Sequence, residues 1–112
     1  MKSVVRWTGG RTMEGETESG KVTPIYSDTA PSPMEMALQA HAACSLVDLR
    51  VGLKDRMENV RAMWVDVEGV RADEPPRVFT SVNMHYVVEG DVPEKLVRRI
   101  LTVSYTHLTL PT

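Results

Sequence analysis

The first third of the chain alternates short mixed stretches with glycines. Residues 2–8 (KSVVRWT) have the composition of a strand and end at Gly9-Gly10, and Gly15 and Gly20 punctuate the polar residues 11–26 at the spacing of hairpin turns. Glycines at such intervals favour turns between short strands. We predict strands at residues 2–8, 12–18 and 21–26, with Pro24 at an edge because proline cannot donate to a strand ladder.

The next segment predicts a long helix. Ser32 and Glu35 have capping-box spacing, and Pro33 occupies the favoured first helical position. From residue 34 to residue 47 only four positions are polar, which predicts a helix that is buried on most faces. Charged residues resume at Asp48, so we expect the helix to emerge into water there and to end near Met57.

Two further stretches alternate with a period of two and predict an antiparallel hairpin. Residues 60–71 (VRAMWVDVEGVR) and 77–88 (RVFTSVNMHYVV) are joined by an acidic, proline-containing loop. Simple alternation places Met84 and Tyr86 on one face of the second strand and Phe79 on the other. A second helix should begin near Val92 or Pro93.

Residues 103–112 (VSYTHLTLPT) differ from the rest of the chain. They carry no charge, end near a proline and abandon the helical period that precedes them. We interpret them as a non-native tail that resembles translated adaptor sequence; the alternative is a genuine extended tail. The folded domain would then cover residues 1–102.

Composition excludes several classes of protein. The net charge is −2, from 13 basic and 15 acidic residues, and no basic stripe indicates a nucleic-acid partner. No apolar run of about 18 residues is present to span a membrane, and Lys2 is followed by a mixed strand instead of a signal core. We expect a cytoplasmic protein, and a chain this small gains stability from oligomerisation.

Cys44 is the only cysteine and the principal candidate for chemistry. On a helix it shares a stripe with His41 and Asp48, because residues three and four apart are neighbours. A nearby imidazolium favours the nucleophilic thiolate, whereas burial opposes it. Spacing alone leaves both a reactive thiol and an inert packed cysteine open. One cysteine and scattered histidines lack the spacing of a metal site.

Glu35 and Arg11 each have two interpretations. Glu35 closes the capping box and suits the positive end of the helix, so we favour capping over catalysis. Arg11 follows Gly9-Gly10 in a polar turn. It is either a solvated loop charge or an electrostatic partner for a thiolate or a peroxide oxygen.

Two strings in the sequence resemble a known family. The string APSPMEMALQAHAACSLVDL resembles the central-helix signature of the OsmC/Ohr family, the osmotically inducible and organic-hydroperoxide-resistance proteins, and VDVEGVRADEPPRVFTSVNMHYVVEGD resembles its hairpin. The resemblance covers about residues 3–101 and is closest to the OsmC-like branch of undefined substrate. It implies an α+β fold, in which an antiparallel sheet packs against a long buried central helix. It also implies an intertwined homodimer whose sheets wrap two central helices, with active sites at the interface.

The resemblance also implies roles for individual residues. In peroxidase members a thiolate attacks the peroxide oxygen, and a second cysteine then forms a disulfide with it. Cys44 matches the attacking thiol, and Arg11 matches the family arginine. Glu35 departs, because the family glutamate occupies the position that Met34 fills here. The second cysteine is absent, so we interpret the chain as truncated at its C-terminal end.

The resulting functional prediction is a thiol-dependent hydroperoxide reductase that needs no cofactor or metal. Its catalytic residues would be Cys44, Arg11 and Glu35, and an external thiol would have to serve as the reductant. The alternatives are a homodimer of the same fold that binds an apolar small molecule, with Cys44 as a lining residue, and a purely structural homodimer.

Overall fold

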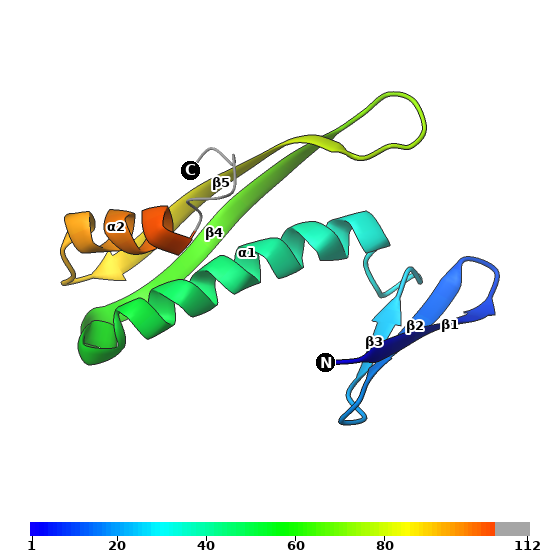
Figure 1. The fold of residues 1–112 in the computed structure, drawn as a ribbon, viewed down its shortest axis with the longest axis horizontal. Helices are drawn as coiled ribbons and strands as arrows, with labels where there is room; N and C mark the ends of the chain where they lie inside the picture. The colour runs from blue at the N-terminus through cyan, green and yellow to red at the C-terminus, as the bar shows by residue number, and fades with distance from the viewer. Residues whose placement is uncertain (105–112) are drawn as a thin grey trace. The chain divides into compact units, whose positions relative to one another are not determined.

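The computed structural model describes residues 1–104, with the side chains of residues 103 and 104 omitted. The chain forms two compact units, one covering residues 1–37 and the other beginning at residue 38 (Figure 1). Each unit has its own architecture. Together they contain the α helices and antiparallel sheets of a mixed α+β protein.

The first unit contains a three-stranded antiparallel sheet. Its strands are β1 (Ser3–Gly9), β2 (Thr12–Thr17) and β3 (Val22–Ile25), in the order β1-β2-β3. Trp7 pairs with Met13, and Met13 with Ile25, so apolar side chains line up across one face. The three predicted strands are present, and Pro24 lies on the edge strand β3 as expected.

Helix α1 (Pro33–Gly52) follows, and it ends earlier than the predicted Met57. A 3-10 helix, η1 (Lys54–Asn59), continues the chain. The change occurs where Leu53 becomes fully buried and its N–H donates to the carbonyl of Leu49 at 2.8 Å. The prediction overran because helical periodicity cannot distinguish a 3-10 turn from another turn of α-helix.

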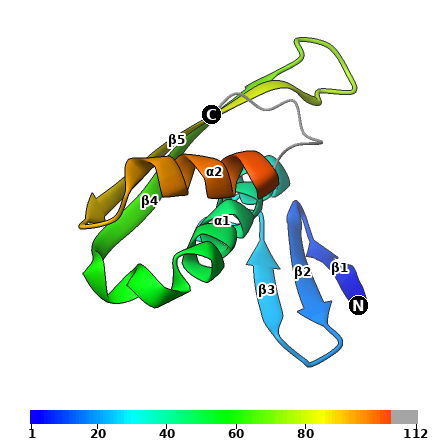
Figure 2. The same ribbon diagram turned by 60° about the vertical axis from the view of Figure 1, so that its left-hand side comes forward.

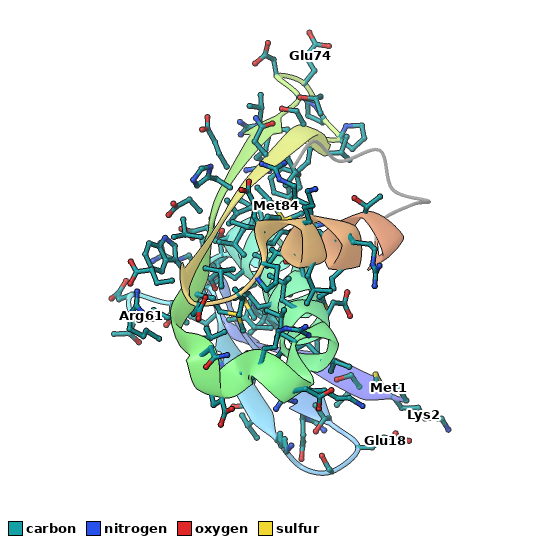
Figure 3. The ribbon with its side chains drawn as sticks, turned by 90° about the vertical axis from the view of Figure 1, so that its left-hand side faces the viewer. Met1, Lys2, Glu18, Arg61, Glu74 and Met84 are labelled. Atoms are coloured by element: carbon teal, nitrogen blue, oxygen red, sulfur yellow. The ribbon has the colours of Figure 1, made fainter. Side chains whose placement is uncertain are left out.

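The second unit is organised by the hairpin of β4 (Val60–Arg71) and β5 (Phe79–Gly90), as the alternation predicted. Val65 lies opposite Tyr86, and Val67 lies opposite Met84. These residues share the face that the helices cover, and Met84 is only 3% exposed. Figure 3 shows Met84 on the side of the hairpin where both helices lie, and Glu74 at the tip of the connecting loop.

The predicted face of Phe79 is wrong, because the register shifts beside the loop that connects β4 to β5. Val70 pairs with Ser81, but Arg71 pairs with Phe79, which leaves Thr80 as an extra residue. Such a bulge reverses the alternation beyond it. The Phe79 ring therefore lies against Gly69, on the helix-covered face.

Glycines allow the helices to approach closely. A Cβ atom at Gly69 would lie 2.6 Å from the Phe79 ring and 2.9 Å from Cδ2 of Leu38 in α1. A Cβ at Gly52 would lie 2.6 Å from Cδ1 of Ile100, in helix α2 (Glu94–Ser104). Helix α2 lies beside the end of the hairpin where β4 begins (Figure 2).

Helix α2 begins close to the predicted start and continues through Ser104, two residues into the segment that we interpreted as a tail. The remainder of that segment, residues 105–112, lies outside the described residues. Across the part of the chain that is described, none of the helices is both long and apolar enough to cross a membrane.

We predict that Gly69→Ala destabilises the protein by about 1–3 kcal/mol, the usual cost of forcing extra volume into a packed site. The added methyl group would collide with the Phe79 ring. Gly15→Ala is the matched control, because its Cβ would meet no atom closer than 3.6 Å. Equilibrium urea unfolding measures both variants, and equal losses of unfolding free energy would contradict this account of Gly69.

Candidate functional site

Cys44 is exposed and lies on the side of α1 that faces away from the hairpin. The buried residues of the helix are Ala42, Ser45 and Leu49, spaced by three and four. At about 100° per residue, Cys44 projects roughly 160° away from Ala42. The hydroxyl of Ser45 donates to the carbonyl of Ala42 at 2.6 Å, so the polar residue on the buried face is hydrogen-bonded.

The exposed side of α1 is apolar as well. Ala40, Cys44, Val47 and Val51 recur at three- and four-residue intervals and are all exposed, and we call these four residues the apolar stripe. Val47 and Val51 are 52% and 58% exposed. The prediction that α1 is buried on most faces is therefore not met within one chain, in which the helix buries one face and leaves a second apolar face in water.

His41 and Asp48 lie beside the stripe and are each half-buried. Helical spacing puts both on the same flank of Cys44, one turn before it and one turn after it. The predicted grouping of these three residues along α1 thus agrees with the helix as formed. The role of His41 toward the thiol remains a prediction.

Glu35 caps the start of α1. The N–H of Ser32 donates to Oε1 of Glu35 at 2.9 Å, and the N–H of Glu35 donates to Oγ of Ser32 at 3.3 Å. Hydrogen bonds to the Glu35 carboxylate, first from the backbone N–H and then from the side chain of Ser32, hold the pKa of Glu35 below its ordinary value of 4.5. Glu35 precedes Cys44 by nine positions, which on a helix is about 13.5 Å of rise and half a turn.

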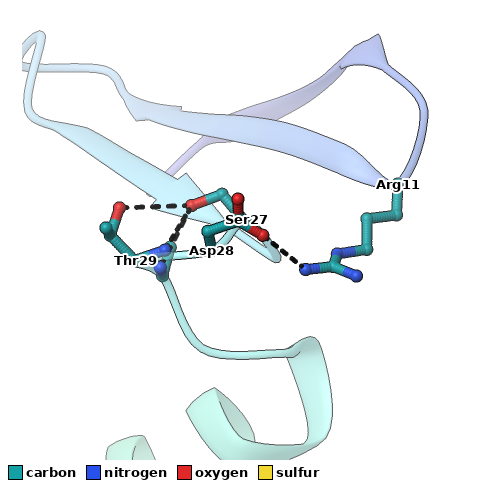
Figure 4. Close-up of polar contacts among 5 residues, drawn as sticks. Arg11, Ser27, Asp28 and Thr29 are labelled. Carbon is teal, nitrogen blue, oxygen red and sulfur yellow. Dashed lines mark hydrogen bonds and ion pairs between the residues drawn. The ribbon is translucent and has the colours of Figure 1, made fainter.

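Arg11 lies in the turn between β1 and β2 and contacts the loop that precedes α1 (Figure 4). Its Nη2 atom is 3.1 Å from Oδ1 of Asp28. Its guanidinium carbon lies 5.3 Å from the centre of the Tyr26 ring, within range of a cation–π interaction. Sequence reasoning did not identify Tyr26 or Asp28, because nothing in the loop's composition indicates which side chain will meet Arg11.

A surface hollow in the second unit offers space for a small molecule. It lies between β5 and α2 and has a volume of about 390 Å³. Its lining combines apolar and charged side chains: Met84, His85, Tyr86, Glu94, Val97, Arg98, Leu101 and Thr102. Cys44 is not among these residues, so the hollow and the thiol are separate features.

No metal centre is evident among residues 1–104, where no three His, Cys, Asp or Glu side chains gather closely enough to hold an ion. Of the three predicted catalytic residues, Cys44 belongs to the second unit, whereas Arg11 and Glu35 belong to the first. Each has defined local surroundings, and their catalytic roles remain predictions.

The lowered pKa of Glu35 predicts a pH dependence of stability. Because the folded pKa lies below that of the unfolded chain, the ionised cap stabilises the fold above about pH 4.5 and loses this effect as pH falls through the folded pKa. We predict that Glu35→Gln lowers the unfolding free energy at pH 7 and that the difference from wild type shrinks at pH 3. Urea titrations at both pH values test this, and a pH-independent difference would contradict it.

Comparison with known proteins identifies the family of the chain. A family model described as OsmC-like protein matches residues 26–107. Protein YhfA of Escherichia coli strain K12 is 36% identical over 108 residues, covering 93% of this chain and 81% of YhfA.

Solved structures agree with this result. One solved structure, described only as structural genomics, is 34% identical and has a TM-score of 0.80. The match covers 94% of this chain and 81% of the chain in that structure. Another is the structure of an organic hydroperoxide resistance protein OsmC from Legionella pneumophila, which is 15% identical and has a TM-score of 0.65. The match covers 97% of this chain and 85% of the Legionella chain, and it shows a likeness of fold alone. From the family model and the identity to YhfA, the chain belongs to the OsmC-like protein family.

Proposed function

We propose that this OsmC-family chain is a thiol-dependent hydroperoxide reductase that acts as a homodimer. The observation that carries the proposal is the exposure of Cys44 in an otherwise apolar helix face. The thiol is exposed in a single chain, and in the proposed dimer it would lie at the seam between two chains, where the surrounding apolar side chains suit an organic substrate. The Legionella protein is named for organic hydroperoxide resistance, and this substrate class matches such a site.

The chemistry begins with the thiolate of Cys44. It attacks the terminal oxygen of the hydroperoxide, the O–O bond breaks, and the products are a sulfenic acid and an alkoxide that takes a proton to become the alcohol. Since the chain has one cysteine, an external thiol then condenses with the sulfenic acid and releases water. A second external thiol frees Cys44 as a thiol and leaves as the disulfide. The reducing cytoplasm supplies such thiols.

We propose different roles for Arg11 and Glu35 in this reaction. A guanidinium presents several N–H donors to an oxygen that gains negative charge, which is the role we propose for Arg11. Glu35 has both of its capping hydrogen bonds in place. We therefore assign it first to the start of α1, where it orders the helix that carries the thiol.

The apolar stripe supports the homodimer. Val47 and Val51 expose more than half of their surface, and covering such side chains releases about 25 cal/mol per Å² of apolar area. The stripe offers small and β-branched residues, which allow helices to pack closely. A second copy of the same stripe matches this surface in its apolar chemistry and would place each thiol at a seam between two chains.

A second function, binding of an apolar small molecule, is favoured by the hollow between β5 and α2. Met84, Val97 and Leu101 supply apolar lining, and Arg98 supplies a charge. A ligand retained through purification, together with no consumption of peroxide, would favour this function over reduction.

Under the proposed function, one equivalent of tert-butyl hydroperoxide oxidises Cys44 to a sulfenic acid. Trapping with dimedone, followed by peptide mass spectrometry, should place the adduct on Cys44. The Cys44→Ser variant is the matched control and should carry no adduct. A wild-type chain that stays unmodified under conditions in which a free cysteine peptide reacts would rule the proposal out.

We predict that the wild-type chain sediments as a dimer of its 12.5 kDa protomer and that Val47→Glu shifts it toward monomer. A carboxylate buried in an apolar interface carries a large desolvation cost. Gln39→Glu adds the same charge at an exposed position of α1 outside the stripe and should leave the dimer intact. Analytical ultracentrifugation compares the three, and a monomeric wild-type chain would contradict the homodimer.

A further inference from the structure

The turn that carries Arg11 is fixed by side-chain hydrogen bonds. The indole N–H of Trp7 donates to the carbonyl of Gly10 at 2.8 Å, and the hydroxyl of Thr12 donates to the carbonyl of Gly9 at 2.7 Å. Gly9 and Gly10 both have positive φ, 126° and 56°, which glycine adopts without strain. The backbone on either side of Arg11 is therefore held in place.

The loop that meets Arg11 is fixed as well. The N–H of Tyr26 donates to the carbonyl of Pro31 at 2.8 Å, which closes the loop at its base. Inside it, Oγ of Ser27 accepts the N–H groups of Thr29 at 3.2 Å and Ala30 at 3.0 Å (Figure 4). Tyr26 and Asp28 thus belong to a loop that these hydrogen bonds close.

Tyr26 carries the only positive φ among the described non-glycine residues, at 59°. The left-handed conformation costs a residue with a Cβ about 1–2 kcal/mol. Asparagine or glycine would occupy this position with less strain. In this conformation the tyrosine ring lies under the Arg11 guanidinium.

We propose that Tyr26 and Asp28 are positioning residues that set the Arg11 guanidinium for an oxygen ligand. This inference rests on the proposed function, in which Arg11 stabilises the oxygen displaced from the hydroperoxide. The guanidinium lies over the Tyr26 ring, 5.3 Å from its centre, and Asp28 receives a hydrogen bond from Nη2. Of the five N–H donors of the guanidinium, the contacts among described residues use one, and the others remain for a ligand.

Neither contact holds the side chain by itself. Asp28 is 99% exposed and Arg11 is 57% exposed, and an ion pair in water contributes little and weakens with salt. Stacking at an exposed site is similarly modest. The two contacts act together because the turn and the loop are each rigid, so little side-chain freedom is left to lose when Arg11 binds a ligand.

The positioning is tested first without any reaction. In ¹⁵N-labelled protein, the Nε–Hε signal of Arg11 should show slower exchange with water than that of exposed Arg61, which lies in β4. Asp28→Asn and Tyr26→Asn should bring Arg11 to the Arg61 value, whereas Asp28→Glu and Tyr26→Phe should preserve the difference. Asparagine tolerates the backbone of Tyr26, so that variant removes the ring without straining the loop. An Arg11 signal like that of Arg61 in the wild-type chain overturns the proposal.

The consequence for function is tested by the rate constant for oxidation of Cys44 by tert-butyl hydroperoxide. We expect Asp28→Asn and Tyr26→Asn each to slow it by about twofold to fivefold, the effect of losing one exposed stacking or charged contact. Asp28→Glu and Tyr26→Phe should restore it, and Arg11→Gln should abolish the sensitivity to both changes.

Unchanged rates in both asparagine variants, with Arg11→Gln slowed, would overturn the positioning role. If wild-type Cys44 does not react at all, the proposed function fails, and the exchange of the Arg11 Nε–H then decides whether Tyr26 and Asp28 position Arg11.

Discussion

One constraint governs the second unit: helix α1 has two apolar faces, and the described residues cover only one of them. Ala42, Ser45 and Leu49 pack inward, and Leu53 continues this buried line beyond the end of the helix. On the opposite face, the side chains of Cys44, Val47 and Val51 are exposed to water. Apolar surface of this kind is costly to leave exposed on a small domain. The exposure of the thiol and the case for a second copy both follow from this arrangement.

The parts of the fold that depend on local chemistry could be predicted from the sequence. The capping box of Ser32 and Glu35 forms with the expected pair of hydrogen bonds. The hairpin strand at residues 60–71 has the predicted bounds, because strict alternation leaves one register that buries the apolar face. Deviations arise where the backbone departs from regular periodicity: the bulge at Thr80 turns Phe79 toward Gly69, and the chain passes from α1 into a 3-10 helix after Gly52.

The site was predictable to a smaller extent. A cysteine in the middle of an apolar helix segment marks the thiol, but periodicity does not show which apolar face lacks a partner within the chain. The packing of α1 within the second unit determines which side of the helix is exposed, and it places Cys44 on that side. The surroundings of Arg11 could not be predicted from the sequence, because they depend on the left-handed backbone of Tyr26 and on a contact with Asp28. No residue pattern encodes either feature.

We propose that Cys44 lies on a helix face that a second copy covers. The most direct test is the rate at which a bulky polyethylene-glycol maleimide alkylates Cys44 as protein concentration rises. We expect fast reaction at low concentration, where single chains expose the thiol, and progressive protection as dimers form. A rate constant independent of concentration and equal to that of an unstructured cysteine peptide would contradict it.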